Sequence, residues 1–284
     1  MAGASCSVGV RALRATRCSG YAVVPGPSSV EDRRARMSTT EHLDPLRSEL
    51  SRLGLEPGAD TLDRFGRYLA LIEEWRVRAG VTAIRDAPTI QQRLFGESLA
   101  LLVALREAAI LEAGESRAVV DIGSGAGVPG IPMGLADAAL ALTLIESHGR
   151  RCEFLETVIA ELALDGITVR RMRAEEAGRD PELREGFDLA VARAVAPLPV
   201  LVEYALPLLR PGGILAAPKG SRARDELREA EAAIETLGGE VLEPLPLSLP
   251  EEAVPQLVVL VRRGGPLSER YPRRPGIPSK RPLA

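Results

Sequence analysis

A glycine-rich loop directly after a short apolar strand is the feature that most limits how this chain can fold. Residues 118–122 read AVVDI, and Gly123, Gly125 and Gly127 follow at once. Glycine lets the backbone adopt positive φ and approach a ligand closely, as the turn after a first parallel strand requires. Pro129 suits the first turn of a following helix, whose N-terminal amides would face that ligand. The loop therefore predicts a nucleotide-type binding turn in an α/β sheet.

An acidic residue at the end of the next predicted strand completes this pattern. Glu146 ends the run 141–146, about 20 residues beyond the glycines, where a carboxylate can accept both hydroxyls of an adenosine ribose. Val128 stands where the dinucleotide-binding fingerprint has its third glycine, which makes an NAD site less favoured. The loop and Glu146 together predict a cofactor that contains adenosine.

From residue 118 onward, short β-rich runs alternate with helical stretches. The expected strands are 118–122, 141–146, 167–172, 187–192 and 213–217, with helices near 130–137, 150–163, 198–209 and 223–237. Such alternation predicts βαβ units with right-handed crossovers and a doubly wound, mostly parallel sheet. Two further strand-like runs, 239–246 and 256–262, predict a C-terminal antiparallel hairpin at the sheet edge.

The segments before and after this α/β region have a different character. Leucines at helical spacing predict an N-terminal helical cap in residues 37–112, and residues 113–263 form the cofactor-binding domain. Residues 264–284 form a basic C-terminal tail, part of a stretch from Arg262 whose net charge is +6. Residues 1–36 show no helical or strand period, and we expect a disordered extension or a mis-assigned start before Met37.

Composition argues against several kinds of site and location. The three cysteines are scattered without Cys-x-x-Cys spacing and there are only two histidines, so we expect neither a disulfide framework nor a metal cofactor. No stretch approaches the roughly 18 apolar residues of a membrane span. Residues 1–36 lack the continuous apolar core of a signal peptide. A cytoplasmic protein is therefore expected.

Two other strand ends carry candidate site residues. Ala174 and Glu175 follow the strand 167–172, where backbone amides and a carboxylate could bind an adenine edge. The same acidic residue could instead complement the dipole of a following helix. Arg193 ends the strand 187–192 beside the expected site, and we predict a functional role for it rather than a solvated position or a simple ion pair.

With these residues in place, the chain resembles the bacterial 16S ribosomal RNA guanine-N7 methyltransferase family, known as RsmG or GidB. The segments that carry the resemblance are VVDIGSGAGVPGIPMGLA (119–136), LTLIESHGRRCEFLETVIAELAL (142–164), RAEE (173–176), FDLAVARAVAPLPVLVEYALPLLRPGGILAAPKG (187–220) and YPRRPGIPSKRPL (271–283). Residues 75–98, which include Trp75-Arg76 and Glu97, depart from the family's pattern near the expected substrate entrance.

The resemblance implies a class I, Rossmann-like methyltransferase that uses S-adenosylmethionine. Its substrate would be N7 of one guanine in the decoding-region loop of 16S ribosomal RNA, free or in the small ribosomal subunit. Carried over by position, the cofactor contacts fall on Gly123, Val128, Ala174, Glu175 and Arg193, with Glu146 on the ribose. The glycine loop itself adds Gly125 to this set.

Methylation at guanine N7 requires little acid–base chemistry from the protein's side chains. N7 already carries an in-plane lone pair, so the enzyme must align the reacting atoms but needs no general base. The sequence has no obvious nucleophile–base or paired-carboxylate pattern, and we predict no catalytic residue in that sense. Arg150, Arg151 and Lys219, with the basic tail, are candidates for phosphate contacts, although Arg150 and Arg151 could also form a solvated helix face.

Two other functions remain compatible with the sequence. The sequence does not determine the oligomeric state. An NAD-dependent oxidoreductase would use the same loop and Glu146, but it would need a substrate domain and a catalytic acid or base. A non-catalytic ribosomal RNA-binding or assembly factor with the same fold would fit the altered region 75–98.

Overall fold

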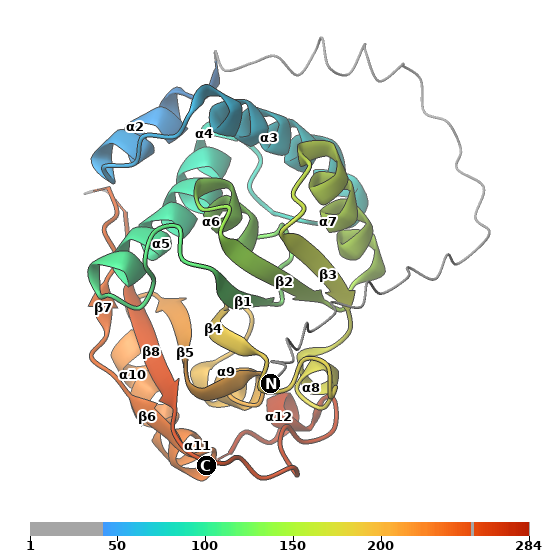
Figure 1. Ribbon diagram of the computed structural model, residues 1–284, viewed down its shortest axis with the longest axis vertical. Helices are drawn as coiled ribbons and strands as arrows, with labels where there is room; N and C mark the ends of the chain where they lie inside the picture. The colour runs from blue at the N-terminus through green and yellow to red at the C-terminus, as the bar shows by residue number, and fades with distance from the viewer. Residues whose placement is uncertain (1–41, 251–252, 284) are drawn as a thin grey trace, which may run out of the picture. The chain divides into compact units, whose positions relative to one another are not determined.

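An eight-stranded mixed sheet runs through the middle of the protein (Figure 1). The computed structural model describes residues 42–250 and 253–283. Along the sheet the strands follow the order β3-β2-β1-β4-β5-β8-β6, and β7 also pairs with β8. The strands are β1 (Arg117–Ile122), β2 (Leu140–Glu146), β3 (Ile167–Arg171), β4 (Phe187–Val191), β5 (Leu209–Lys219), β6 (Gly239–Val241), β7 (Leu245–Pro246) and β8 (Leu257–Arg263).

The strand directions confirm the predicted fold class. Strands β1 to β5 are parallel, and the order reverses between β1 and β4, which is where doubly wound sheets bind ligands. Strand β8 lies antiparallel to β5, with β6 and β7 on its outer side. The predicted hairpin is thus present, with its first run divided into two short strands.

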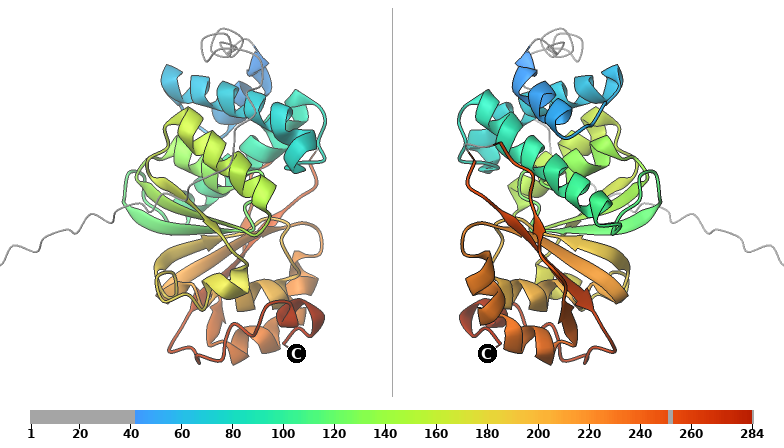
Figure 2. Two further views of the ribbon diagram at one scale, coloured as in Figure 1. Left: turned by 90° about the vertical axis from the view of Figure 1, so that its right-hand side faces the viewer. Right: turned by 90° about the vertical axis from the view of Figure 1, so that its left-hand side faces the viewer.

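Helices cover both faces of the sheet (Figure 2). One face carries α6 (Gly130–Ala136) and α7 (Gly149–Leu162); the other carries α8 (Ala174–Ala177), α9 (Leu198–Ala205), α10 (Ala223–Glu229), α11 (Glu231–Thr236) and α12 (Ile277–Lys280). Neighbouring residues of β1 point to opposite sides, since Val119 belongs to one buried apolar cluster and Val120 to the other. The helix expected over 223–237 is divided at Ala230.

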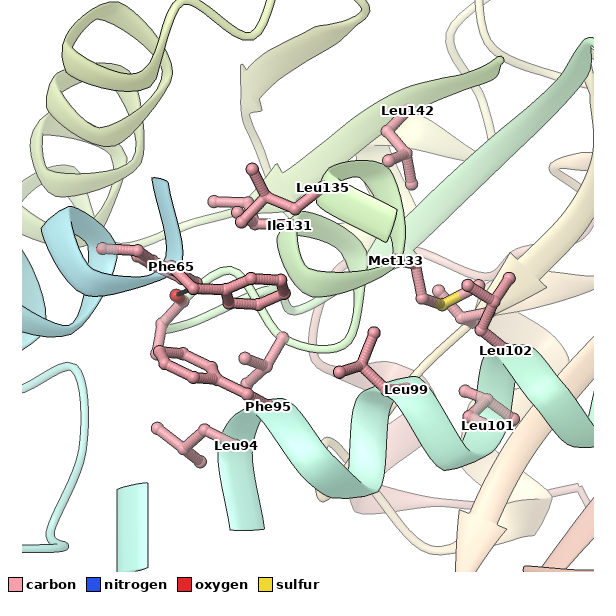
Figure 3. Packing of buried hydrophobic residues seen from close by; sticks show 14 of the residues in the cluster. Phe65, Leu94, Phe95, Leu99, Leu101, Leu102, Ile131, Met133, Leu135 and Leu142 are labelled. Carbon is pink, nitrogen blue, oxygen red and sulfur yellow. Dashed lines mark hydrogen bonds between the residues drawn. The ribbon is translucent and has the colours of Figure 1, made fainter. Parts of the chain in front are cut away.

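The predicted helical cap packs directly on α6. Its elements are α2 (Asp44–Arg52), α3 (Ala59–Ala79), α4 (Ala87–Ile90), the π-helix η2 (Gln91–Gly96) and α5 (Glu97–Glu107). The rings of Phe65 and Phe95 lie 5.3 Å apart and pack with Leu99 and Ile131 (Figure 3). Each fully buried side chain of this size contributes about 1.5–3 kcal/mol. Cap and sheet therefore share one core.

All the described residues belong to one compact unit by their contacts. The divisions that we predicted after residues 112 and 263 fall inside this unit and stay predictions. The predicted extension 1–36 lies outside the described residues.

The C-terminal tail folds back onto α8 and α9. The carboxylate of Glu203, fully buried, accepts hydrogen bonds from the Arg273 guanidinium at 2.6–3.1 Å. Arg179 donates to the carbonyl of Pro272 at 2.7 Å, and the amide of Gly276 donates to Glu175 at 2.8 Å. Arg273, one cation of the basic tail, is therefore paired with an acidic residue of the protein itself.

Candidate functional site

The glycine loop has the backbone geometry that its sequence predicts. Gly123, Gly125 and Gly127 have φ of +69°, +56° and +84°. A Cβ on Gly127 would lie 2.4 Å from Ile131 Cδ1, so both the turn and the packing require glycine there. Around Gly125 the nearest atom to such a Cβ is 3.8 Å away, so the loop is open on that side. The loop can therefore accept a ligand at Gly125.

Glu146 meets the glycine loop, as the sequence predicts. Its Oε2 accepts the amide of Gly125 at 3.0 Å, and its Oε1 accepts the amide of His148 at 2.8 Å. The carboxylate is buried, and Arg151 Nη1 lies 3.8 Å from Oε2. Each carboxylate oxygen can accept a further hydrogen bond, because it has two lone pairs. This arrangement suits a pair of ribose hydroxyls.

Asp121 is a buried acid whose importance the sequence analysis missed. Its Oδ2 accepts the amide of Gly130 at 2.9 Å, whereas its Oδ1 has no hydrogen-bond partner among the described residues. Burial raises the pKa of Asp121 to about 7. The first amide of α6 thus binds Asp121, so our expectation that the N-terminal amides of this helix face the ligand is wrong for Gly130. The available signal was a single charge in the apolar strand AVVDI.

Arg193 lies beside this loop and is held by the cap. Its Nη1 donates to the backbone carbonyl of Arg93 at 2.6 Å and lies 3.4 Å from Glu97 Oε2. Burial lowers the pKa of Arg193. The Arg93 carbonyl belongs to the π-helix η2, and such irregular turns are frequent at functional sites. No local signal in the sequence indicated either cap contact.

A cavity of about 800 Å³ opens at this end of the sheet. The cap lines it with Thr82, Arg93 and Glu97. The opposite side comes from the loop after β4, the end of β5 and α10, with Arg193, Val195, Lys219 and Glu226. A Cβ on Gly123 would lie 2.9 Å from Val195 Cγ2, so the cavity adjoins the glycine loop through Val195. The glycine loop and the cavity, the two parts of a candidate active site, are therefore neighbours.

The three predicted phosphate-binding cations lie in different surroundings. Lys219 Nζ donates to the carbonyl of Ala196 at 2.9 Å and to Glu226 at 2.8 Å, inside the cavity. Arg151 donates to the carbonyl of Gly80 at 3.1 Å, next to its contact with Glu146. Arg150 is exposed at the start of α7. The structure therefore does not gather them into one patch.

The remaining predicted cofactor residues lie around the same strand ends. Val128 is buried and its amide donates to the carbonyl of Ser124, while Ala174 is half-buried at the start of α8. The Glu175 side chain is buried and accepts the tail amide of Gly276. That side chain therefore has a structural partner, and a cofactor contact by Glu175 stays a prediction.

The sequence predicts neither a metal site nor a membrane span, and both points can be compared with the part of the chain that the structure describes. Within residues 42–250 and 253–283 there is no group of three or more His, Cys, Asp or Glu side chains placed to hold a metal ion. No helix in the same residues is long and apolar enough to span a bilayer.

Known proteins resemble this chain over most of its length. The family model GidB, rRNA small subunit methyltransferase G, matches residues 61–252. Ribosomal RNA small subunit methyltransferase G from Roseiflexus castenholzii is 42% identical over 81% of this chain and 95% of its own length. The protein of the same name from Symbiobacterium thermophilum is 40% identical over 87% of this chain and 100% of its own.

Proposed function

Because this chain belongs to the rRNA small subunit methyltransferase G (GidB) family, we propose that it methylates N7 of a guanine in the decoding-region loop of 16S ribosomal RNA. The methyl donor is S-adenosylmethionine, and the reaction takes place in the cytoplasm on free RNA or on the small ribosomal subunit.

The contact between Glu146 and the glycine loop carries this proposal. The carboxylate and the Gly125 amide lie 3.0 Å apart at the carboxyl ends of β2 and β1, and the same glycine loop adjoins a cavity of about 800 Å³ through Val195. An adenosine cofactor fits here because Gly125 leaves open space and Glu146 keeps free lone pairs. The neighbouring Asp121 is buried, and its Oδ1 has no hydrogen-bond partner within the described chain.

The protein's own residues then bind and orient. S-adenosylmethionine supplies an electrophilic methyl group on a sulfonium sulfur. Glu146 accepts the ribose hydroxyls, and Gly123, Val128 and Ala174 present backbone to the cofactor. The buried carboxylate of Glu146 favours a cationic ligand at this edge of the sheet. Alignment of the donor with the base is the main contribution to the rate.

The cavity beside the loop is the place for the target base. Arg193 lines it, together with Lys219, and its loop adjoins Gly123 through Val195. RNA-modifying enzymes act on bases that are unstacked and inserted into such pockets. Arg150 and the exposed cations of the tail are the phosphate contacts that hold the RNA in register.

The test is a methyl-transfer assay with mapping of the product. Purified protein is incubated with labelled S-adenosylmethionine and either free 16S ribosomal RNA or small subunits that lack the modification. We expect one N7-methylguanine in the decoding region and tight binding of S-adenosylmethionine by calorimetry. Glu146→Gln should weaken that binding at least about tenfold, because a hydrogen bond to a charged group contributes about 1.5–3 kcal/mol.

Each alternative function predicts a different result. Tight binding of NADH without binding of S-adenosylmethionine would indicate an oxidoreductase, a function that the relatives do not favour. Binding of ribosomal RNA without methyl incorporation would indicate a non-catalytic assembly factor.

A further inference from the structure

Glu97 is an acidic residue that lines the cavity and has no role in the function as proposed above. It begins α5, its side chain is 14% exposed, and it lines the cavity from the cap side. The cap places it in the same cavity as Arg193, in the loop after β4, and Lys219, at the end of β5. A carboxylate in such a partly buried pocket needs hydrogen-bond donors.

The contacts of Glu97 leave room for such donors. Its Oε2 lies 3.4 Å from Arg193 Nη1, and its Oε1 lies 3.5 Å from Arg93 Nε. Both distances are longer than the usual 2.7–2.9 Å of a charge-assisted hydrogen bond. Arg193 Nη1 donates only this long hydrogen bond to Glu97 Oε2 and a shorter one, 2.6 Å, to the carbonyl of Arg93. The two guanidinium groups therefore hold Glu97 in place without using all of its acceptor capacity.

The chemistry of guanine matches a free carboxylate. On its Watson–Crick edge guanine presents two adjacent donors, N1–H and the exocyclic amine, so one carboxylate can accept both. Guanine O6 is an acceptor on the same edge, but adenine, cytosine and uracil each lack two adjacent donors, because every donor on their edge has only acceptors beside it. Flipped bases are commonly identified by hydrogen bonds to this edge. N7 lies on the opposite side of the base and stays free to react.

We propose that Glu97 selects the target base, guanine, by accepting hydrogen bonds from N1–H and the exocyclic amine in the cavity; this rests on the function proposed above. The same carboxylate stabilises the product. In the transfer, the N7 lone pair forms a bond to the methyl carbon, the carbon–sulfur bond breaks, and its electron pair stays on sulfur. No proton moves, and the positive charge passes from the sulfonium to the guanine ring. Glu97 lowers the energy of that charge beside Arg193 and Arg93.

The experiment compares Glu97→Gln and Glu97→Asp with Glu107→Gln, a control at an exposed position on the same helix. Each protein is assayed on an RNA fragment that carries either guanine or inosine at the position where the wild type places the methyl group. Inosine keeps N7 and N1–H but lacks the exocyclic amine. Affinity for S-adenosylmethionine and the urea midpoint of unfolding are measured alongside.

We expect inosine to lower kcat/KM of the wild type about tenfold or more, because a site built for a donor rejects the analogue that lacks it. Glu97→Gln should lose about tenfold or more on guanine and show little further loss on inosine. Glu97→Asp should recover part of the rate, and Glu107→Gln should match the wild type. Cofactor affinity and the urea midpoint should stay near wild-type values.

Two results would overturn the proposal while leaving the proposed function intact. One is an equal inosine penalty in the wild type and in Glu97→Gln. The other is a loss of S-adenosylmethionine affinity that accounts for the whole rate defect, because Glu97 would then act only by positioning Arg193. A wild type that transfers no methyl group to RNA would refute the proposed function itself, and this inference with it.

Discussion

Replacement of the buried Asp121 by asparagine gives a direct test of the electrostatics at the end of β1. Asp121 is fully buried, its Oδ2 accepts the Gly130 amide, and burial raises its pKa from 3.8 to about 7. The unfolded chain ionises this group near pH 4, whereas the folded chain keeps it protonated to about pH 7. The stability that the protonated form provides is therefore fully present below pH 4 and is lost as the pH rises through 7.

The size of the effect follows from the pKa difference. Between pH 5.5 and pH 7 the wild type should lose about 2 kcal/mol through this group, at 1.36 kcal/mol for each pH unit. An asparagine side chain cannot ionise and keeps an oxygen for the Gly130 amide, so Asp121→Asn removes this slope. Its buried amide nitrogen adds a cost that does not depend on pH. The prediction therefore concerns the change with pH and not the absolute stability.

Urea denaturation of both proteins at pH 5.5 and pH 8 measures this change. We expect the stability of Asp121→Asn relative to the wild type to increase by about 2 kcal/mol from the lower to the higher pH. Asp165→Asn, at an exposed aspartate, controls for the removal of one carboxylate. A stability difference between Asp121→Asn and the wild type that stays constant with pH would refute the reasoning, because burial of Asp121 would then not have shifted its pKa.

Three further substitutions test other contacts. Arg273→Ala should lower the free energy of unfolding by about 3 kcal/mol in urea, because it leaves the buried Glu203 carboxylate unpaired; an effect under about 0.5 kcal/mol, typical of a surface position, would contradict this. Gly127→Ala should weaken S-adenosylmethionine binding in calorimetry and lower stability, since its Cβ would lie 2.4 Å from Ile131 Cδ1; unchanged affinity would show that the loop is not part of the cofactor site. Arg193→Ala should reduce methyl transfer far more than folding stability, and a wild-type rate would remove Arg193 from the site.

The sheet was largely predictable because its signals are local. Apolar runs followed by glycine or polar residues indicate β1 to β4 with most ends within a residue or two of the structure. Strand β5 begins at Leu209 instead of Gly213, since it continues through Pro211 and Gly212, residue types that are typical of turns. The register shifts between Phe187 and Leu189 on the partner strand, and this irregularity accommodates those residues.

The candidate site was predictable only where neighbouring strand ends define it. Gly125 follows β1 and Glu146 ends the adjacent parallel strand β2, so topology alone brings them together. No such topological rule predicts the contacts between the cap and the site. Tyr68, whose hydroxyl donates to the carbonyl of Ala126, and Glu97 reach the site through the packing of helices distant in sequence. Only the fold determines which face of a cap helix meets the loop.

Glu175 shows why a local pattern could not decide between two roles. The sequence allowed an adenine contact or a helix-dipole contact, yet the side chain is buried and accepts the amide of Gly276, 101 residues further along the chain. A buried carboxylate must find donors, and here the tail provides one. Since Glu203 holds Arg273 in the same way, the tail is fixed at two points beside the strand end that presents Ala174. Its exposed cations, Arg274 and Arg281, are then held in a defined place, where we propose that they contact the phosphates of the RNA.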